Sequence, residues 1–198
     1  VSITGNVKTS LLGSDSFQEV DIAGVTMPVT KYSFIASGER GVAQDVREAF
    51  SIAQSGRKGP VLVDIPADIA AQSEEYERAP KSEPAPAKEP EKAELERAAQ
   101  MIEKAKRPLI YVGGGARSSG AQDALKTFAQ KLHIPVACSM MGLGAYPCSA
   151  ELFLGLVGMH GNPAANMAAL NCDLLIAAGA RFSNRVAASK ESFAPKAT

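Results

Sequence analysis

The sequence predicts an α/β protein built from parallel β-sheets with helices packed on their faces. Short apolar runs that suit buried strands alternate with stretches of helical period, and glycine-rich turns join them. The composition also breaks once: residues 72–92 are rich in Glu, Lys, Pro and Ala and contain no large aliphatic side chain. We therefore expect two α/β pieces, 1–71 and 93–198, on either side of an exposed linker, 72–92.

Elements of the first piece follow from apolar spacing. Residues 1–12 suggest a strand and a turn, in a chain expected to begin inside a domain, and 18–25 suggest a short helix. Residues 32–36 read as a strand. Apolar side chains recur every three or four residues over 41–54, which predicts an amphipathic helix. Residues 60–65, PVLVDI, form a continuous apolar run typical of a strand buried on both faces.

The second piece alternates helices and strands. Helices are predicted over 93–105, 121–132 and 162–170, and strands over 109–112, 134–140 and 173–178. In the first of these helices, Leu95, Ala98, Ala99 and Ile102 are expected to face inward. Residues 155–161 read as a glycine-rich loop, which leaves a sheet of three strands.

Composition excludes some classes of function. The 198 residues carry 21 basic and 21 acidic side chains, and this balance argues against a nucleic-acid or membrane-surface partner held by charge. No apolar run approaches the ~18 residues of a membrane helix. The three cysteines, Cys138, Cys148 and Cys172, and the two histidines have no metal-ligand spacing, so we expect no metal site and reduced thiols in a cytoplasmic compartment.

Residues 107–120, RPLIYVGGGARSSG, read as a strand, a glycine turn and the start of a helix, as in nucleotide-binding α/β units. Gly113 and Gly115 fit the first two glycines of a dinucleotide fingerprint, but Ser118 occupies the third place. No acidic residue follows in the next strand, roughly twenty residues on. The alternative is a glycine-rich connection with nothing bound.

Glycines follow several strand ends, where ligands of parallel sheets bind. The segments are 113–115, 139–144, 155–161 and 179–181. An extended ligand across this edge would meet Arg181 and Arg185, which suit phosphates, and His160, which suits a sugar or a ring. Solvated arginines and a packed or capping histidine are the alternative. No Ser/His/Asp set, Cys/His pair or spaced carboxylate pair stands out.

Several longer segments carry a family resemblance. They are GSDSFQEVDIAGVTMPVTKYSF, SGRKGPVLVDIPADI, YVGGGARSSG, MGLGAYP, GLVGMHGNPAANMAALNCDLLIAAGARFSNRV and FAPKA. Through them the chain resembles the acetolactate synthase family, and more narrowly the catalytic subunit of its biosynthetic, FAD-containing type, also called acetohydroxyacid synthase. The GMHG and GARF segments are specific to the flavin-containing branch.

The resemblance implies a partial chain. Residues 1–71 would be the C-terminal part of a thiamine pyrimidine-binding domain, and 93–198 the first part of a Rossmann-like, FAD-binding middle domain. The family is a carboligase (a transferase) of branched-chain amino-acid biosynthesis. It decarboxylates pyruvate on thiamine diphosphate and joins the product to a second 2-oxoacid, with a flavin that is not oxidised or reduced in the net reaction. The partners implied are a second catalytic subunit, in a homodimer or tetramer, and a regulatory subunit.

Site residues are also implied by the resemblance. FAD contacts are expected from Arg57, Gly113, Gly114, Gly115, Ser139, Met140, Met141, Met159, His160, Gly179, Ala180, Arg181, Arg185 and Val186. Phe17 and Gln18 match positions that line the substrate and cofactor cavity at the dimer interface. Thiamine diphosphate and Mg²⁺ would be bound mainly by parts outside this chain, so no catalytic residue or metal ligand is expected here, and the chain alone should be inactive.

The sequence departs from the family pattern at two places. Ala67 stands where a cavity-lining lysine is usual, and Ser183 and Asn184 replace two aspartates. Two alternatives to the flavoenzyme remain: a flavin-free thiamine-dependent 2-oxoacid decarboxylase or carboligase, and a non-catalytic nucleotide-binding module. GMHG and GARF argue against the first, and a yellow colour of the protein would distinguish it.

Overall fold

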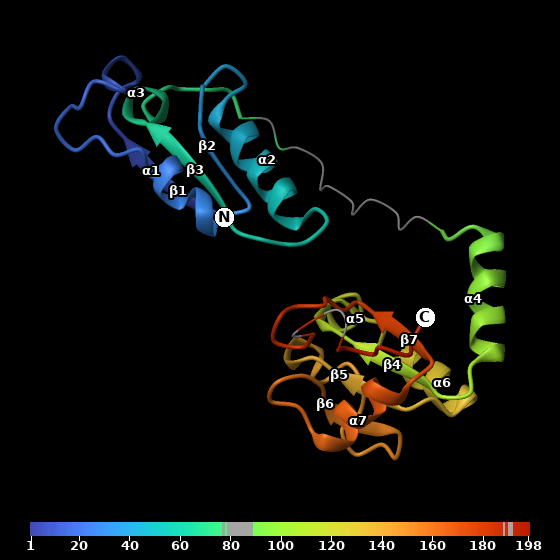
Figure 1. The fold of residues 1–198 in the computed structure, drawn as a ribbon. Helices are drawn as coiled ribbons and strands as arrows, with labels where there is room; N and C mark the ends of the chain where they lie inside the picture. The colour runs from blue at the N-terminus through green and yellow to red at the C-terminus, as the bar shows by residue number, and fades with distance from the viewer. Residues whose placement is uncertain (77, 79–88, 188, 190–191) are drawn as a thin grey trace. The chain divides into compact units, whose positions relative to one another are not determined.

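The computed structural model describes residues 1–76, 78, 89–187, 189 and 192–198. The chain divides into two compact units, Val1–Ala85 and Pro86–Thr198 (Figure 1). Most of the predicted linker, at 77 and 79–88, lies outside the described residues, and the predicted domain boundaries stay a prediction. Within the described part, no helix is long and apolar enough to cross a membrane.

The first unit is built on a parallel sheet of order β1-β3-β2, formed by β1 (Ser2–Asn6), β2 (Tyr32–Ile35) and β3 (Val61–Pro66). The central strand is the apolar run that the sequence singles out, and its residues from Val61 to Asp64 are all buried. Helix α2 (Val42–Gln54) supplies Ala49 to the core on one face of this sheet.

Short elements complete the first unit. They are η1 (Thr9–Leu11), α1 (Ile22–Thr26), η2 (Met27–Val29) and α3 (Ala67–Ala70). The helix predicted from residue 18 begins later, because the Asp21 carboxylate accepts a hydrogen bond from the Gly24 amide at 2.9 Å and caps α1 at that point. The residues before Asp21 form a loop instead.

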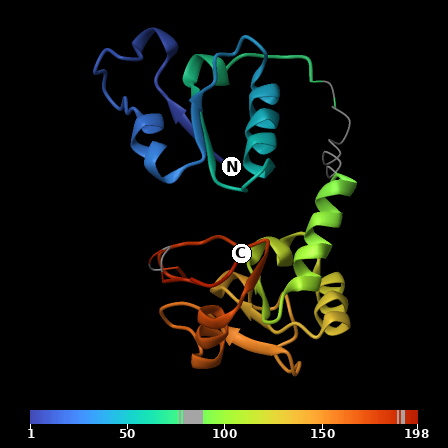
Figure 2. The ribbon, with the colours of Figure 1, turned by 45° about the vertical axis from the view of Figure 1, so that its right-hand side comes forward.

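The second unit contains a parallel sheet of order β6-β5-β4-β7. Figure 2 shows this unit, coloured from green to red along the chain, from a second direction. Its strands are β4 (Pro108–Val112), β5 (Val136–Cys138), β6 (Phe153–Leu156) and β7 (Leu174–Ala178). The predicted α/β class with parallel strands is therefore confirmed, but the expectation of three strands is wrong. Strand β6 escapes the sequence pattern because it is short and contains Gly155 at a φ of +91°, where the pairing with β5 is irregular.

Helices α6 (Gln122–Leu132) and α7 (Pro163–Asn171) cover opposite faces of this sheet. The unit also contains α4 (Lys92–Lys104), α5 (Gly114–Ser118) and η3 (Met140–Gly142) after β5. Alternate residues of β4 point to opposite cores: Ile110 packs with α6, and Tyr111 packs with α7. The inward face predicted for α4 is wrong for Leu95, Ala98 and Ala99, which are exposed. It is correct for Ile102, near the end of the helix, which packs against the core.

Candidate functional site

All four strands of the second sheet end at one edge, and the loops that follow them begin there. Val112, the last residue of β4, is in register with Cys138 of β5 and Ala178 of β7, and Cys138 is in register with Leu156 of β6. The residues that follow these strands therefore lie side by side. With the exception of Arg57, the residues predicted to contact FAD all lie in the loops and short helices that follow these strands.

The glycines of this edge hold the loops together. The Gly113 amide donates to the Ala178 carbonyl, and the Gly115 amide donates to the Gly179 carbonyl, both at 2.9 Å. A Cβ on Gly179 would stand 2.2 Å from the backbone nitrogen of Ala116. Much of the glycine pattern is thus explained by close backbone contact between β4 and β7, which needs no ligand.

Exposed thioether side chains line the same edge. Met140, Met141 and Met159 are exposed by 63%, 62% and 61%. Met140 and Met141 belong to η3 after β5, whereas Met159 follows β6.

Two arginines follow β7 at this edge, and one of them contacts a methionine. The guanidinium of Arg185 approaches the Met159 sulfur at 3.8 Å, and the Met159 amide donates to the Arg185 carbonyl at 2.9 Å. These contacts join the turn after β7 to the loop after β6. Arg181 and His160 are also exposed, so the edge combines apolar surface with cationic groups.

The loop after β6 is fixed from α7. The Asn166 side chain accepts from the Gly158 amide at 2.8 Å and donates to the Gly158 carbonyl at 3.1 Å. At the start of the helix, Asn162 accepts from the Ala164 amide at 2.9 Å, and Pro163 occupies the first turn. Met159 and His160 therefore stand on a well-anchored segment.

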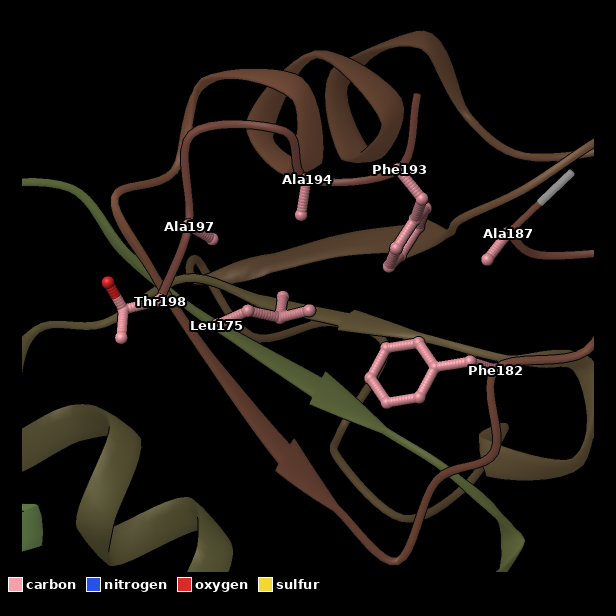
Figure 3. A pocket seen from close by; sticks show the side chains of 7 residues that line it. All are labelled: Leu175, Phe182, Ala187, Phe193, Ala194, Ala197 and Thr198. Carbon is pink, nitrogen blue, oxygen red and sulfur yellow. The ribbon is translucent and has the colours of Figure 1, made fainter. Parts of the chain in front are cut away.

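An apolar cavity of about 450 Å³ lies behind the turn after β7. Figure 3 shows the side chains that line it, with Phe182 and Phe193 both turned toward the space above Leu175. None of the predicted FAD contacts lines this cavity, although Phe182 and Ala187 belong to the same turn as Arg181 and Val186. Its two phenylalanines pack against each other with ring centroids 5.9 Å apart.

Arg57, the remaining predicted FAD contact, lies in the first unit. It is exposed in the turn that leads from α2 to β3. Lys31 orders this turn, because its ammonium donates to the carbonyls of Ile52 and Ser55 at the end of α2 and to the Ser55 hydroxyl at 3.0 Å. No relation between Arg57 and the second unit follows from these contacts.

Phe17 and Gln18 stand on a loop shaped by Glu19. The Glu19 carboxylate accepts from the amides of Gly13 and Ser16, and these hydrogen bonds, that from Ser16 foremost, hold the pKa of Glu19 below its ordinary value. Phe17 is 88% exposed, and Gln18 has a φ of +67°, a rare conformation for a residue other than glycine. Glu19 thus has a local structural role that the sequence did not reveal.

The positions that depart from the family pattern are exposed or partly exposed. Ala67 begins α3 and is exposed. The Ser183 carbonyl accepts from the amides of Val186 and Ala187 at 2.9 and 2.8 Å, and Asn184 is exposed in the same turn.

Other reactive groups are scarce. No group of three or more His, Cys, Asp or Glu residues that could hold a metal occurs in the part of the chain that the structure describes. The cysteines are free, and burial, with a smaller effect from Cys148, raises the pKa of Cys138 to about 11. A thiol with such a pKa is a poor nucleophile at neutral pH.

Comparison with known proteins adds a family match. Residues 95–198 match the family described as thiamine pyrophosphate enzyme, central domain. The chain is 44% identical over 200 residues to the acetolactate synthase large subunit of Corynebacterium glutamicum, covering 100% of this chain and 32% of that protein. It is 44% identical over 198 residues to the acetolactate synthase isozyme 2 large subunit of Escherichia coli, covering 100% and 36%.

A plant protein shows the same likeness. The chloroplastic acetolactate synthase of Arabidopsis thaliana is 43% identical over 202 residues, covering 100% of this chain and 30% of that protein. The chain thus spans about a third of the length of the curated relatives that it matches. The resemblance indicated by the motifs is confirmed.

Proposed function

The chain belongs to the thiamine pyrophosphate enzyme family, and we propose that it is part of the large, catalytic subunit of an acetolactate synthase. Its sequence identity of 44%, over the whole length of this chain, to proteins of that name supports this proposal. The complete protein would decarboxylate pyruvate and join the product to a second 2-oxoacid, in branched-chain amino-acid biosynthesis. Thiamine diphosphate, when bound, supplies the nucleophilic carbon for this chemistry.

In this proposal, the residues at the carboxyl edge of the second sheet bind a flavin. The observation that carries the proposal is the carboxyl edge of the second sheet. Met140, Met141 and Met159 are exposed in the segments after β5 and β6, and the exposed Arg181 and Arg185 follow β7. FAD combines a flat, largely apolar ring system with a diphosphate. Thioethers are soft, adaptable partners for such a ring, and guanidinium groups bind phosphate bidentately. The residues present therefore fit the cofactor.

Other residues of the predicted set have subsidiary roles. The glycines at 113–115 allow the flavin chain to approach the backbone, and His160 would hydrogen-bond to its sugar or ring. Arg57 is included on the strength of its SGRKGP motif. Phe17 and Gln18 would line the substrate cavity, with Phe17 providing an exposed apolar surface.

Partners and location follow from the relatives and the cysteines. Several relatives are named large subunits, which supports a smaller regulatory partner for this protein as well. We also expect a second catalytic subunit, and Mg²⁺ with the thiamine diphosphate. Three free cysteines, one of them exposed at position 148, suit a reducing compartment such as the cytoplasm.

The test is made on the full-length protein. We expect acetolactate to form from pyruvate when thiamine diphosphate, Mg²⁺ and FAD are supplied, and the purified protein to show flavin absorption bands. Activity that is independent of added FAD, in a colourless protein, would favour the flavin-free decarboxylase or carboligase. Flavin binding without any product from pyruvate would favour a nucleotide-binding module.

A further inference from the structure

Tyr111 occupies an unusual place in the second sheet. It is the penultimate residue of β4 and is 0% exposed. Its neighbours in register are both alanines, Ala137 on β5 and Ala177 on β7. Small residues on the two flanking strands leave room for one large ring on the α7 side of the sheet, next to the carboxyl edge.

The Tyr111 hydroxyl contacts the turn after β7. It donates to the Arg181 carbonyl at 3.0 Å, across a sequence separation of 70 residues. The ring packs against Phe182 and Phe193, with centroids 5.6 and 6.0 Å away. One side chain therefore holds both the backbone of Arg181 and the side chain that follows it.

The same hydroxyl lies in a desolvated place. Burial is the main cause that raises the pKa of Tyr111, and the Ser139 side chain acts in the opposite direction. The hydroxyl is thus protonated at neutral pH and remains a donor.

We propose that Tyr111 is a positioning residue of the carboxyl edge, whose hydroxyl fixes the backbone of Arg181 so that the guanidinium is presented to a bound diphosphate. The ligand part of this inference rests on the proposed flavin function. Tyr111 itself is buried beneath the edge and acts on the ligand through Arg181.

Tyr146 provides a matched comparison in the same unit. It is also buried, with 2% exposure, and its ring stacks on Phe153 with centroids 6.3 Å apart. Its hydroxyl, however, has no hydrogen-bond partner among the described residues. Tyr→Phe at the two positions removes the same atom from similar surroundings, so a difference between the variants reports the hydrogen bond from Tyr111 to Arg181.

The first experiment measures FAD affinity of the full-length protein by quenching of flavin fluorescence. Loss of one neutral hydrogen bond should raise the Kd of Tyr111→Phe roughly 3- to 10-fold, whereas Tyr146→Phe should stay within about 2-fold of wild type. Equal affinities of Tyr111→Phe and wild type would overturn the ligand part of the inference.

A double-mutant cycle separates positioning from general destabilisation. If Tyr111 acts through Arg181, the Tyr111→Phe change should have little further effect on the Kd in an Arg181→Ala background. A full additional 3- to 10-fold loss in that background would contradict the proposed route.

A second measurement needs no flavin. In the flavin-free protein, we expect trypsin to cleave after Arg181 several-fold faster in Tyr111→Phe than in wild type or Tyr146→Phe. Cleavage after Arg117, exposed on α5, serves as the internal reference, and a lower digestion temperature compensates for any loss of stability. Unchanged cleavage after Arg181 would overturn the positioning role. A wild-type protein that binds no FAD would overturn the proposed function, while this comparison still decides the role of Tyr111.

Discussion

Gly113 and Gly179 meet backbone to backbone, and a Cβ built on Gly113 would stand 2.3 Å from the Gly179 carbonyl oxygen and 2.4 Å from the Cα of Ala180. The contact joins the end of β4 to the end of β7, so the spacing of the two loops is set by the absence of side chains. No rotamer can relieve such a clash, because both partners are main chain.

Gly113→Ala should therefore destabilise the second unit. We expect a loss of roughly 1–3 kcal/mol in the free energy of unfolding, as for overpacked sites. Gly144→Ala is the control: a Cβ there meets nothing within 4 Å, and only its φ of +83° opposes the change. Urea unfolding of both variants measures the difference, and a smaller loss for Gly113→Ala than for Gly144→Ala would contradict the steric argument.

Arg181→Ala should weaken flavin binding. Losing a charge-assisted hydrogen bond to a phosphate costs about 1.5–3 kcal/mol, which corresponds to about one to two decades in affinity. Arg107→Ala is a suitable control, because Arg107 precedes β4 and so lies at the opposite edge of the same sheet. Flavin titration of the full-length variants tests the assignment, and equal retention of flavin by wild type and Arg181→Ala would reject it.

Asp173 should make the stability of the second unit depend on pH. Its carboxylate accepts from the amides of Lys106 and Arg107, each at 2.8 Å. The Lys106 bond is the main cause that lowers the pKa of Asp173 from its ordinary value of 3.8. Because the folded state favours the ionised form, the stabilisation is present above about pH 4 and is lost as the pH falls through the lowered pKa.

The comparison of wild type with Asp173→Asn isolates this effect. Their difference in free energy of unfolding should be constant near neutral pH and shrink as the solution is acidified below about pH 4. Glu103→Gln, a change on the exposed surface of α4, serves as the control. A wild-type advantage over Asp173→Asn that persists unchanged at the lowest pH would refute the linkage.

Glu19→Ala should loosen the loop that carries Phe17 and Gln18. The amides of Gly13 and Ser16 lose their acceptor, so their hydrogen exchange should become faster. Asp21→Ala is the control, since it removes the cap of α1 and should expose only the Gly24 amide. Unchanged exchange at Gly13 and Ser16 in Glu19→Ala would show that the loop holds its shape without the carboxylate.

The fold was predictable wherever apolar residues carried a clear period. Strand β3 and helix α2 appear within one residue of their predicted limits, because a buried central strand and an amphipathic helix leave strong patterns. Strand β6 left none, since Gly155 and the irregular pairing with β5 interrupt it. The first turns of α4 read as buried from their spacing, but spacing alone does not show how far a helix extends past its sheet.

The candidate site was also predictable in part, because its position follows from the order of the strands. Parallel strands bring their carboxyl ends to one edge, so the meeting of Gly113, Ser139 and Gly179 follows from the order of elements. Tyr111 could not be recognised in this way, because a tyrosine inside LIYV looks like any core residue until its hydroxyl is seen to reach Arg181. Whether Arg57 joins the flavin contacts stays a prediction.

The turn at Ser183 has a consequence for natural variation and for engineering. The turn uses the carbonyl of Ser183, and the side chains of Ser183 and Asn184 make no hydrogen bond within the described residues. Variants with aspartate or another small polar residue at these positions should therefore still fold. A library restricted to small polar residues at both positions would keep most of its members folded, so that selection on it would act on ligand preference.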